Sequence, residues 1–232
     1  DLVFSSLLSE IRKIPQLEEL YVSVDSGFTL SEEELRSLSN LRVLNLKNCR
    51  MKEFPEGIEH LQQLEEIDLT ANCLKSLPEK FFSTSAESIS LEENGDLEVL
   101  PNIPKNPHIE TLNLISTGLQ EVPKSIENLT NLVSLRLLGT RITSLPESIN
   151  KLSQLRFLGI QSTDLEKVPD LRGTQVETFL DFYYTKQLPE GKLTKEEQFK
   201  YVENDFLLSE ELKVDEKKLP STFNLFELSR RS

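Results

Sequence analysis

Residues 132–154 read LVSLRLLGTRITSLPESINKLSQ, and residues 109–131, which come directly before them, read IETLNLISTGLQEVPKSIENLTN. When the two stretches are aligned, their apolar positions and the proline coincide. A stretch of 23 residues that recurs in this way predicts one structural unit that occurs more than once. The first question is therefore how far along the chain the repetition extends.

The repeat extends over most of the chain. Its consensus is L-x-x-L-x-L-x-x-N-x-L-x-x-L-P-x-x-I-x-x-L-x-x, and looser copies occupy residues 17–40 and 176–189. The L-x-L core predicts a short strand, and the proline ends the strand ladder, so a short helical or extended return segment follows. Because one unit cannot bury its leucines alone, the units are expected to stack. Regular units cover residues 41–63, 64–85, 86–108, 109–131, 132–154 and 155–175.

The ninth position of each unit suits a tight turn after the strand, because its residue is small and weakly polar. In successive units this residue is Cys49, Asn72, Asn94, Thr117, Thr140 and Thr163. We expect Cys49 to be a buried replacement for asparagine, with a reactive thiol or a bridge to Cys73 as the alternatives. Two cysteines in total cannot build a disulfide framework or a zinc site, which favours a reducing compartment or a chain that is indifferent to its redox state.

This consensus resembles that of leucine-rich repeats, and the resemblance covers residues 17–189. Its L-P-x-x-I-x-x-L form resembles intracellular scaffold proteins such as erbin and scribble, and the repeat arms of bacterial effectors that are delivered into host cells. The resemblance implies an α/β solenoid, a horseshoe with a parallel concave sheet, short helical or irregular convex segments and helical caps. It also implies protein binding, often to small GTPases or ubiquitination substrates, and a location in the cytoplasm or, for an effector, inside a host cell.

The two ends of the chain depart from the repeat and predict caps. Residues 1–16 are expected to form an N-terminal helical cap or the remnant of a trimmed repeat, and residues 17–189 the repeat domain. Residues 190–232 are expected to form a C-terminal helical cap and tail, in which Thr194 and Glu197 have the spacing of a capping box. This helix covers the last unit or, in the alternative, binds a partner.

Charge and motif content exclude several classes of function. The net charge is −13, from 26 basic and 39 acidic residues, and this field repels the phosphates of nucleic acids and anionic lipids. No apolar run is long enough to span a membrane. No glycine-rich phosphate loop, Ser-His-Asp arrangement or set of metal ligands occurs in the sequence. We therefore expect no enzyme activity, no cofactor or metal, and neither nucleic acid nor a membrane as a partner.

The open face of the predicted sheet is the candidate binding site. The third, fifth, seventh and eighth positions of each unit lie between or beside the buried leucines and point outward. An acidic patch is expected around Asp68 and Glu92, and apolar residues are expected around Arg136, a composition typical of binding hot spots. In the alternative, the C-terminal tail covers these residues. The candidate partner-binding residues are Asp68, Glu92, Ile115, Arg136, Leu138, Phe157, Gln161, Phe182 and Tyr183.

Two functions of different classes fit these features. The first is a non-catalytic protein–protein interaction module that binds a partner protein on its concave face. The second is the substrate-recruiting repeat arm of a larger enzyme, for example a ubiquitin ligase or a bacterial effector, whose catalytic domain lies outside this chain. A secreted recognition receptor fits less well, because its caps would usually be paired by cysteines.

Overall fold

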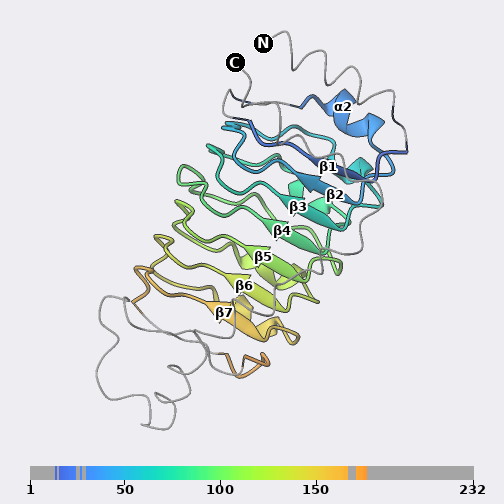
Figure 1. Ribbon diagram of the computed structural model, residues 1–232. Coiled ribbons are helices and arrows are strands. Elements are labelled where there is room, and N and C mark those ends of the chain that lie inside the picture. The colour runs from blue at the N-terminus through green and yellow to red at the C-terminus, as the bar shows by residue number, and fades with distance from the viewer. Residues whose placement is uncertain (1–13, 15, 25–26, 28–29, 167–170, 177–232) are drawn as a thin grey trace, which may run out of the picture.

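In the part of the chain that the structure describes, seven short strands form one parallel sheet in which each strand pairs with the next along the chain (Figure 1). The structure is a computed structural model that describes residues 14, 16–24, 27, 30–166 and 171–176. Each strand covers the third to fifth positions of a unit, which confirms the predicted solenoid. The strands are β1 (Glu19–Tyr21), β2 (Val43–Asn45), β3 (Glu66–Asp68), β4 (Ser88–Ser90), β5 (Thr111–Asn113), β6 (Ser134–Arg136) and β7 (Phe157–Gly159).

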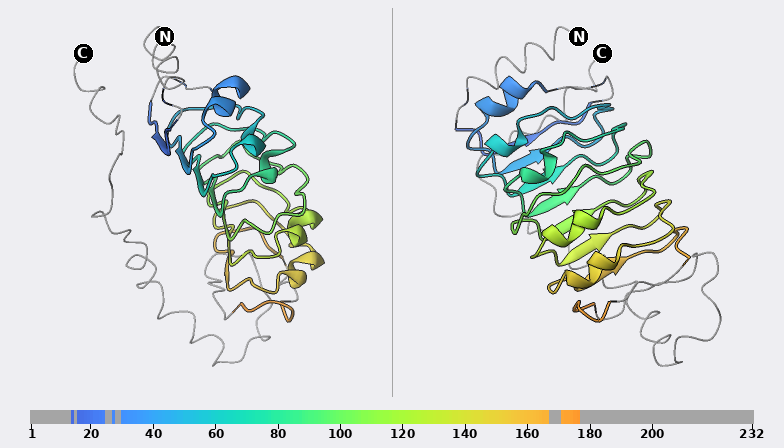
Figure 2. Two further views of the ribbon diagram at one scale, coloured as in Figure 1. Left: turned by 90° about the vertical axis from the view of Figure 1, so that its right-hand side faces the viewer. Right: turned by 180° about the vertical axis from the view of Figure 1, so that it is seen from behind.

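The register of the sheet places equivalent positions of successive units side by side. Leu20, Leu44 and Ile67, all at the fourth position, are partners across β1, β2 and β3, and the column ends at Leu158 in β7. These side chains belong to one hydrophobic core that runs through the whole stack. Figure 2 shows the strands along one side of the stack and the short helices along the other. The sheet therefore buries one face against the core and turns its other face outward.

Asn72, at the ninth position, joins two neighbouring units through its buried side chain. Its Oδ1 accepts hydrogen bonds from the backbone N–H groups of Cys49 and Met51, at 3.1 and 2.9 Å. Its Nδ2 donates to the carbonyl groups of Leu46 and Leu69, both at 2.8 Å. A single amide thus pairs backbone groups of two neighbouring units that are shielded from water, and buried backbone groups need such partners.

The threonines at the same position make fewer bonds than the asparagines. Asn94 also reaches the preceding unit, because its Nδ2 donates to the carbonyl of Leu69 at 3.0 Å. The Thr140 hydroxyl donates only to the carbonyl of Leu137 in its own unit, at 2.7 Å. Thr117 and Thr163 repeat this contact at 2.9 and 2.8 Å. The ninth residue therefore ties adjacent units together in the N-terminal part of the stack and not in the C-terminal part that the structure describes.

Cys49 is fully buried at the ninth position, as predicted. Its thiol donates to the carbonyl of Val22 at 3.2 Å and so contacts the preceding unit. Burial raises the pKa of this thiol to about 11, so it stays protonated at neutral pH. Cys73 is exposed, and both cysteines are free. The two alternative predictions, a Cys49–Cys73 bridge and a reactive Cys49 thiol, are therefore wrong.

The eighth position adopts a left-handed backbone in every regular unit. Glycine occurs there only once, at Gly139 with φ +67°. The strain of this conformation, about 1 kcal/mol or more for a non-glycine residue, is offset by a ladder bond to the next unit, as when Ala71 N donates to the Glu92 carbonyl at 2.9 Å. The other residues with this conformation are Asn48, Ala71, Glu93, Ser116 and Ser162.

The convex side carries short 3₁₀ helices, as the proline in the consensus predicts. The unit of residues 86–108 has none, because its return segment reads PNIPKNP over residues 101–107 and prolines lack the N–H group that a helix needs. Asn106 fixes this extended segment by donating to the carbonyls of Phe82 and Thr84, both at 2.8 Å. The 3₁₀ helices are η1 (Ile58–His60), η2 (Phe81–Ser83), η3 (Lys124–Asn128) and η4 (Glu147–Lys151).

The looser unit of residues 17–40 contains an α-helix that the sequence analysis did not predict. Helix α2 (Glu32–Ser37) begins with a capping box, in which Glu34 N donates to Ser31 Oγ at 3.2 Å and Ser31 N donates to Glu34 Oε2 at 2.7 Å. The sequence does contain a signal for the start of this helix, because Ser31 is followed three residues later by Glu34. The predicted cap of residues 1–16, except Ile14 and Gln16, and the predicted cap and tail of residues 190–232 lie outside the described residues.

Candidate functional site

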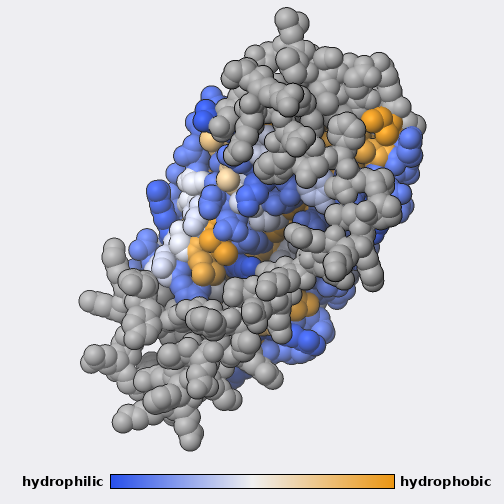
Figure 3. Space-filling model, in the orientation of Figure 1, coloured by the Kyte–Doolittle hydropathy of each residue, from blue (hydrophilic) through white to orange (hydrophobic). Residues whose placement is uncertain are grey.

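The open face of the sheet, seen from the front in Figures 1 and 3, is lined by the third, fifth and seventh positions of each unit. The fifth-position column runs in register from Tyr21 in β1 through Asp68 in β3 and Arg136 in β6 to Gly159 in β7, as predicted. We call the part that belongs to β1–β4 the N-terminal half of the open face, and the part that belongs to β5–β7 the C-terminal half.

The N-terminal half is acidic. It carries one cation, Lys47, and four carboxylates at the third, fifth and seventh positions, which are Glu19, Glu66, Asp68 and Glu92. Asp68 is held in place, because Asn45 Nδ2 donates to its Oδ2 at 3.2 Å and Thr70 N donates to its Oδ1 at 2.9 Å. Glu92 Oε2 accepts a hydrogen bond from Asn113 Nδ2 at 2.9 Å. These contacts hold two of the predicted site residues in a polar network.

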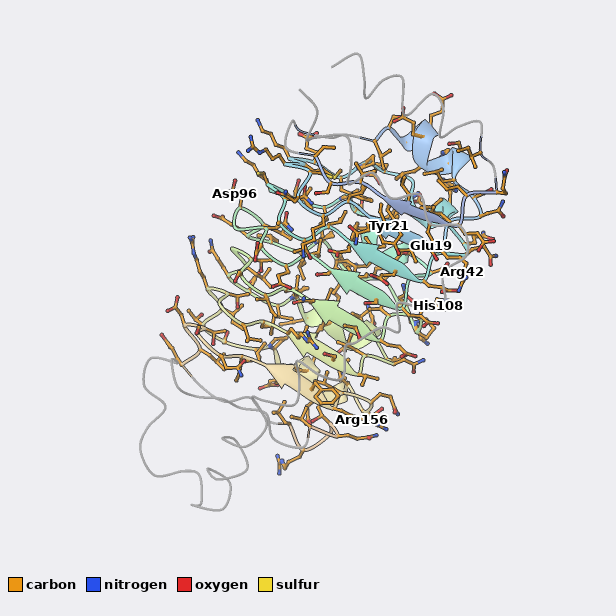
Figure 4. All side chains as sticks on the ribbon, viewed as in Figure 1. Glu19, Tyr21, Arg42, Asp96, His108 and Arg156 are labelled. Atoms are coloured by element: carbon orange, nitrogen blue, oxygen red, sulfur yellow. The ribbon has the colours of Figure 1, made fainter. Side chains whose placement is uncertain are left out.

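The carboxylates of this half repel one another. Partial removal from water, followed by the charges of Asp68 and Glu19, raises the pKa of the Glu66 carboxyl although the side chain is still exposed. The same causes, removal from water and then Glu19 and Glu66, raise the pKa of the Tyr21 hydroxyl. Figure 4 shows Glu19 and Tyr21 next to each other on β1. The N-terminal half is thus a region of negative potential.

The C-terminal half has no carboxylate at the third, fifth or seventh position, and Arg136 is its only charged residue at these positions. Ile115 and Leu138 are half-buried at the seventh position, and Phe157 at the third position is 41% exposed. Figure 3 shows hydrophobic side chains gathered over this lower part of the face, within a mainly hydrophilic surface. Among the described residues, no carboxylate forms an ion pair with the Arg136 guanidinium.

Gly159 shapes the surface next to Arg136, its register partner in β6. The space that a Cβ atom would occupy on Gly159 is filled by Leu138 Cδ1, and Gln161 Oε1 lies 3.7 Å from that position. Gln161 Oε1 is buried and accepts no hydrogen bond, and the same holds for the Ser134 hydroxyl, which neither donates nor accepts one. Two buried polar atoms without partners thus lie in the C-terminal half, and buried polar atoms are usually paired.

The structure therefore places the predicted residues Asp68, Glu92, Ile115, Arg136, Leu138, Phe157 and Gln161 on the open face. Phe182 and Tyr183 lie outside the described residues, so their role stays a prediction. Ser134 and Gly159 were missed. The signal for Gly159 was a glycine in a strand, which often marks close approach of another group, whereas nothing in the sequence reveals an unpaired hydroxyl.

A second surface feature lies at the edge of the sheet. The unit of residues 86–108 has two residues between its ninth position and the next apolar residue, Leu97, where the other regular units have one. The second of these, Asp96, projects at the edge opposite to Arg42 and Arg156 (Figure 4). A shallow hollow there is lined by Lys75, Leu77, Asp96, Val99 and Pro101, among others. Val99 is 58% exposed, and the hollow, about 590 Å³ in volume, is lined by both basic and acidic side chains.

Two further properties concern only the described part of the chain. No group of three or more His, Cys, Asp or Glu residues there is arranged to hold a metal ion. No helix there has the length and apolar character that crossing a membrane requires.

Comparison with known proteins identifies the repeat. A family model described as leucine-rich repeats (2 copies) matches residues 39–81. The human PH domain leucine-rich repeat-containing protein phosphatase 1 is 28% identical over 95 residues, which are 40% of this chain and 6% of the phosphatase. The volume-regulated anion channel subunit LRRC8D of Rattus norvegicus is 31% identical over 65 residues, which are 28% of this chain and 8% of the subunit. The chain thus matches a small part of the length of these curated relatives.

A solved structure extends the similarity over more of the chain. A leucine-rich repeat protein of Leptospira interrogans superposes with a TM-score of 0.54 at 25% identity. The superposition covers 78% of this chain and 53% of that protein. It therefore includes units well beyond the two that the family model matches.

Proposed function

Because this chain is a leucine-rich repeat protein, and such domains are generally protein–protein interaction modules, we propose that it is a non-catalytic module that binds a partner protein on its concave face. The observation that carries the proposal is the C-terminal half of the open face. There Ile115, Leu138 and Phe157 are half-buried or exposed beside Arg136. Apolar and aromatic side chains next to an arginine match the composition of interface hot spots.

The test is the affinity of the chain for its natural partner, identified by affinity purification with mass spectrometry. Leu138→Asp places a charge in the apolar surface, and we expect it to weaken binding at least tenfold. Val99→Asp is the matched control, because Val99 is an exposed aliphatic residue at the edge of the sheet and not on the open face. Both variants must keep the circular dichroism spectrum of the wild type. Unchanged affinity of Leu138→Asp for the partner would refute the proposal.

A second candidate function is the substrate-recruiting arm of a larger enzyme. It is favoured by one observation: a relative of which the chain matches only 6% is named a protein phosphatase. In this case the repeats still bind a protein, and the catalytic domain lies elsewhere in a longer chain. Determination of the full-length reading frame separates the two candidates, because only the second needs a catalytic domain on the same polypeptide.

For location we propose the cytoplasm, or the interior of a host cell if the protein is a delivered effector. The support is chemical: Cys49 and Cys73 are both free thiols, and Cys73 is exposed. An exposed free thiol is rare in proteins that work in oxidising compartments. Fractionation of cells that express the tagged protein tests this proposal, and recovery from the secreted or periplasmic fraction would contradict it.

A further inference from the structure

We propose that the C-terminal half of the open face binds an acidic–apolar segment of the partner, in which a carboxylate pairs with Arg136 and an adjacent aliphatic or aromatic side chain packs on Leu138 and Phe157. This inference rests on the proposed function and deepens it, because it states the chemistry of the segment that is bound.

Arg136 carries a positive charge that no described carboxylate neutralises. Arg136 is half-buried as a residue, and no described carboxylate forms an ion pair with its guanidinium. The nearest carboxylate on the open face along the stack is that of Glu92, two strands away, which already accepts a hydrogen bond from Asn113. Asn113 Oδ1 in turn accepts from Ile115 N at 3.1 Å. Arg136 can therefore offer its planar donor fork to a carboxylate from outside.

Two polar side-chain atoms in the same half of the open face are buried and have no hydrogen-bond partner among the described residues. Ser134 is 7% exposed and lies in register beside Phe157, and its hydroxyl makes no hydrogen bond. Gln161 Oε1, close to Gly159, is also buried and unpaired. A buried polar atom without a partner is unfavourable. A peptide backbone carries both N–H and C=O groups and can satisfy an acceptor and a hydroxyl at once.

The absence of a side chain at Gly159 determines the shape of the surface near Arg136. Because Gly159 has no side chain, Leu138 leans over it, and Leu138 and the exposed 41% of Phe157 contribute apolar surface to this half of the open face. An apolar side chain that follows the carboxylate in the partner would cover this surface. A basic segment is disfavoured here, because Arg136 would repel it. It would be attracted instead to Glu19, Glu66 and Asp68 in the N-terminal half.

The experiment is a selection of random peptides displayed on phage against the full 232-residue chain. We expect the selected peptides to be enriched in aspartate or glutamate next to leucine, isoleucine or phenylalanine. A selected peptide is then synthesised with a fluorophore, and its affinity is measured by fluorescence polarisation. Arg136→Gln should weaken it about tenfold or more. Lys47→Gln removes one positive charge from the N-terminal half of the same face and should leave the affinity unchanged.

Arg136→Lys gives a second test that does not depend on loss of charge. It keeps the positive charge but lacks the planar fork, so the affinity should fall between those of the wild type and Arg136→Gln. Equal loss in Arg136→Gln and Lys47→Gln, absence of acidic enrichment, or recovery of no peptide would each overturn the inference. The proposed function has a separate readout, because weakening of the natural partner by Leu138→Asp does not depend on the charge of a selected peptide.

The same experiment can also reveal a different ligand on this face, either a segment of the chain itself or a second copy of the chain. The chain itself contains an acidic–apolar stretch, ENDFLLSEELKVDE at residues 203–216, and a synthetic peptide of this sequence is included as a probe. If it binds more tightly than every selected peptide, the chain's own segment is the occupant and the inference is overturned. Light scattering tests a second copy: a concentration-dependent dimer that Arg136→Gln abolishes would also overturn it.

Discussion

The N-terminal and C-terminal halves of the stack share one fold but differ in three features. Asparagine holds the ninth position at residues 72 and 94 and bonds two units together, whereas threonine at residues 117, 140 and 163 bonds within one. The open face changes from four carboxylates to a single arginine among apolar residues. On the convex side, the helices fall into two groups, η1 with η2 and η3 with η4 (Figure 2).

All three changes occur within the units of residues 86–108 and 109–131. The extended PNIPKNP segment separates the two groups of helices, and Asp96 lengthens the turn at the opposite edge. Because each unit contacts only its neighbours, a repeat protein can vary one part of the stack with little effect on the rest. In the N-terminal half the ninth residue bonds neighbouring units together, and the C-terminal half carries the proposed binding surface.

The largest expected effect concerns the ninth position. Asn72→Ala leaves the N–H groups of Cys49 and Met51 and the carbonyl of Leu46 without their side-chain partner, whereas the Leu69 carbonyl keeps its bond from Asn94. We expect the free energy of unfolding to fall by about 3–5 kcal/mol, since each such group costs about 1 kcal/mol or more.

The matched variant in the other half is Thr140→Ala, which removes only the bond to Leu137. It should cost about 1 kcal/mol. Urea denaturation followed by circular dichroism measures both variants. If both variants lose the same free energy of unfolding, the ninth residue contributes equally to stability in the two halves, and the proposed difference between them is wrong.

The next effect concerns the boundary between the halves. A Cβ atom on Gly118 would overlap the backbone carbonyl oxygen of Gly95, which cannot rotate away as a side chain can. We expect Gly118→Ala to destabilise the protein by about 1–3 kcal/mol. Cys73, at the same position of an earlier unit, is exposed, so Cys73→Ala should change stability by less than about 0.5 kcal/mol. Thermal denaturation measures the stability of both variants. If Gly118→Ala is as stable as the wild type, the boundary between the two halves is not tightly packed.

The smallest expected effect concerns the acidic half. The pKa of Glu66 is raised above its ordinary value of 4.5, so its ionisation is harder in the folded chain than in the unfolded one. This contribution to stability is present at low pH and is lost as the pH rises through the folded pKa. Glu66→Gln should therefore raise the free energy of unfolding by about 0.3 kcal/mol at pH 7 and leave it unchanged below pH 4.

Denaturation of wild type and Glu66→Gln at pH 3.5, 5 and 7 checks this sign. A variant that is less stable than wild type at pH 7 would mean that Glu66 has a favourable partner, and the N-terminal half would not be a region of mutual repulsion.

The sequence predicted the features that depend on the period. The strands, the buried leucine columns, the fifth-position register and the burial of Cys49 all follow from one repeated pattern. The left-handed eighth position could not be read from it, because Ala71 and Glu93 have no preference for that conformation and hold it through ladder bonds to the next unit. Helix α2 was missed because residues 17–40 were interpreted only as a looser copy of the repeat, and the capping box at Ser31 and Glu34 was not considered.

The candidate site also has features that the sequence predicted and features that only the structure shows. Alternation along each strand predicted that Arg136 and Leu138 face outward, because this depends only on the backbone period. The unpaired Ser134 hydroxyl and the position of Leu138 over Gly159 depend on side-chain conformations that only the structure shows. The chemistry proposed for the partner therefore comes mainly from the structure.

The most direct test of the account is photo-cross-linking with benzoylphenylalanine in place of Leu138, in the full chain and in the cells that produce it. The account predicts a cross-link to a separate protein from this position, and none to that protein when benzoylphenylalanine replaces Val99 at the edge of the sheet. A cross-link from position 138 only to the chain's own residues, or equal cross-linking from both positions, would contradict it.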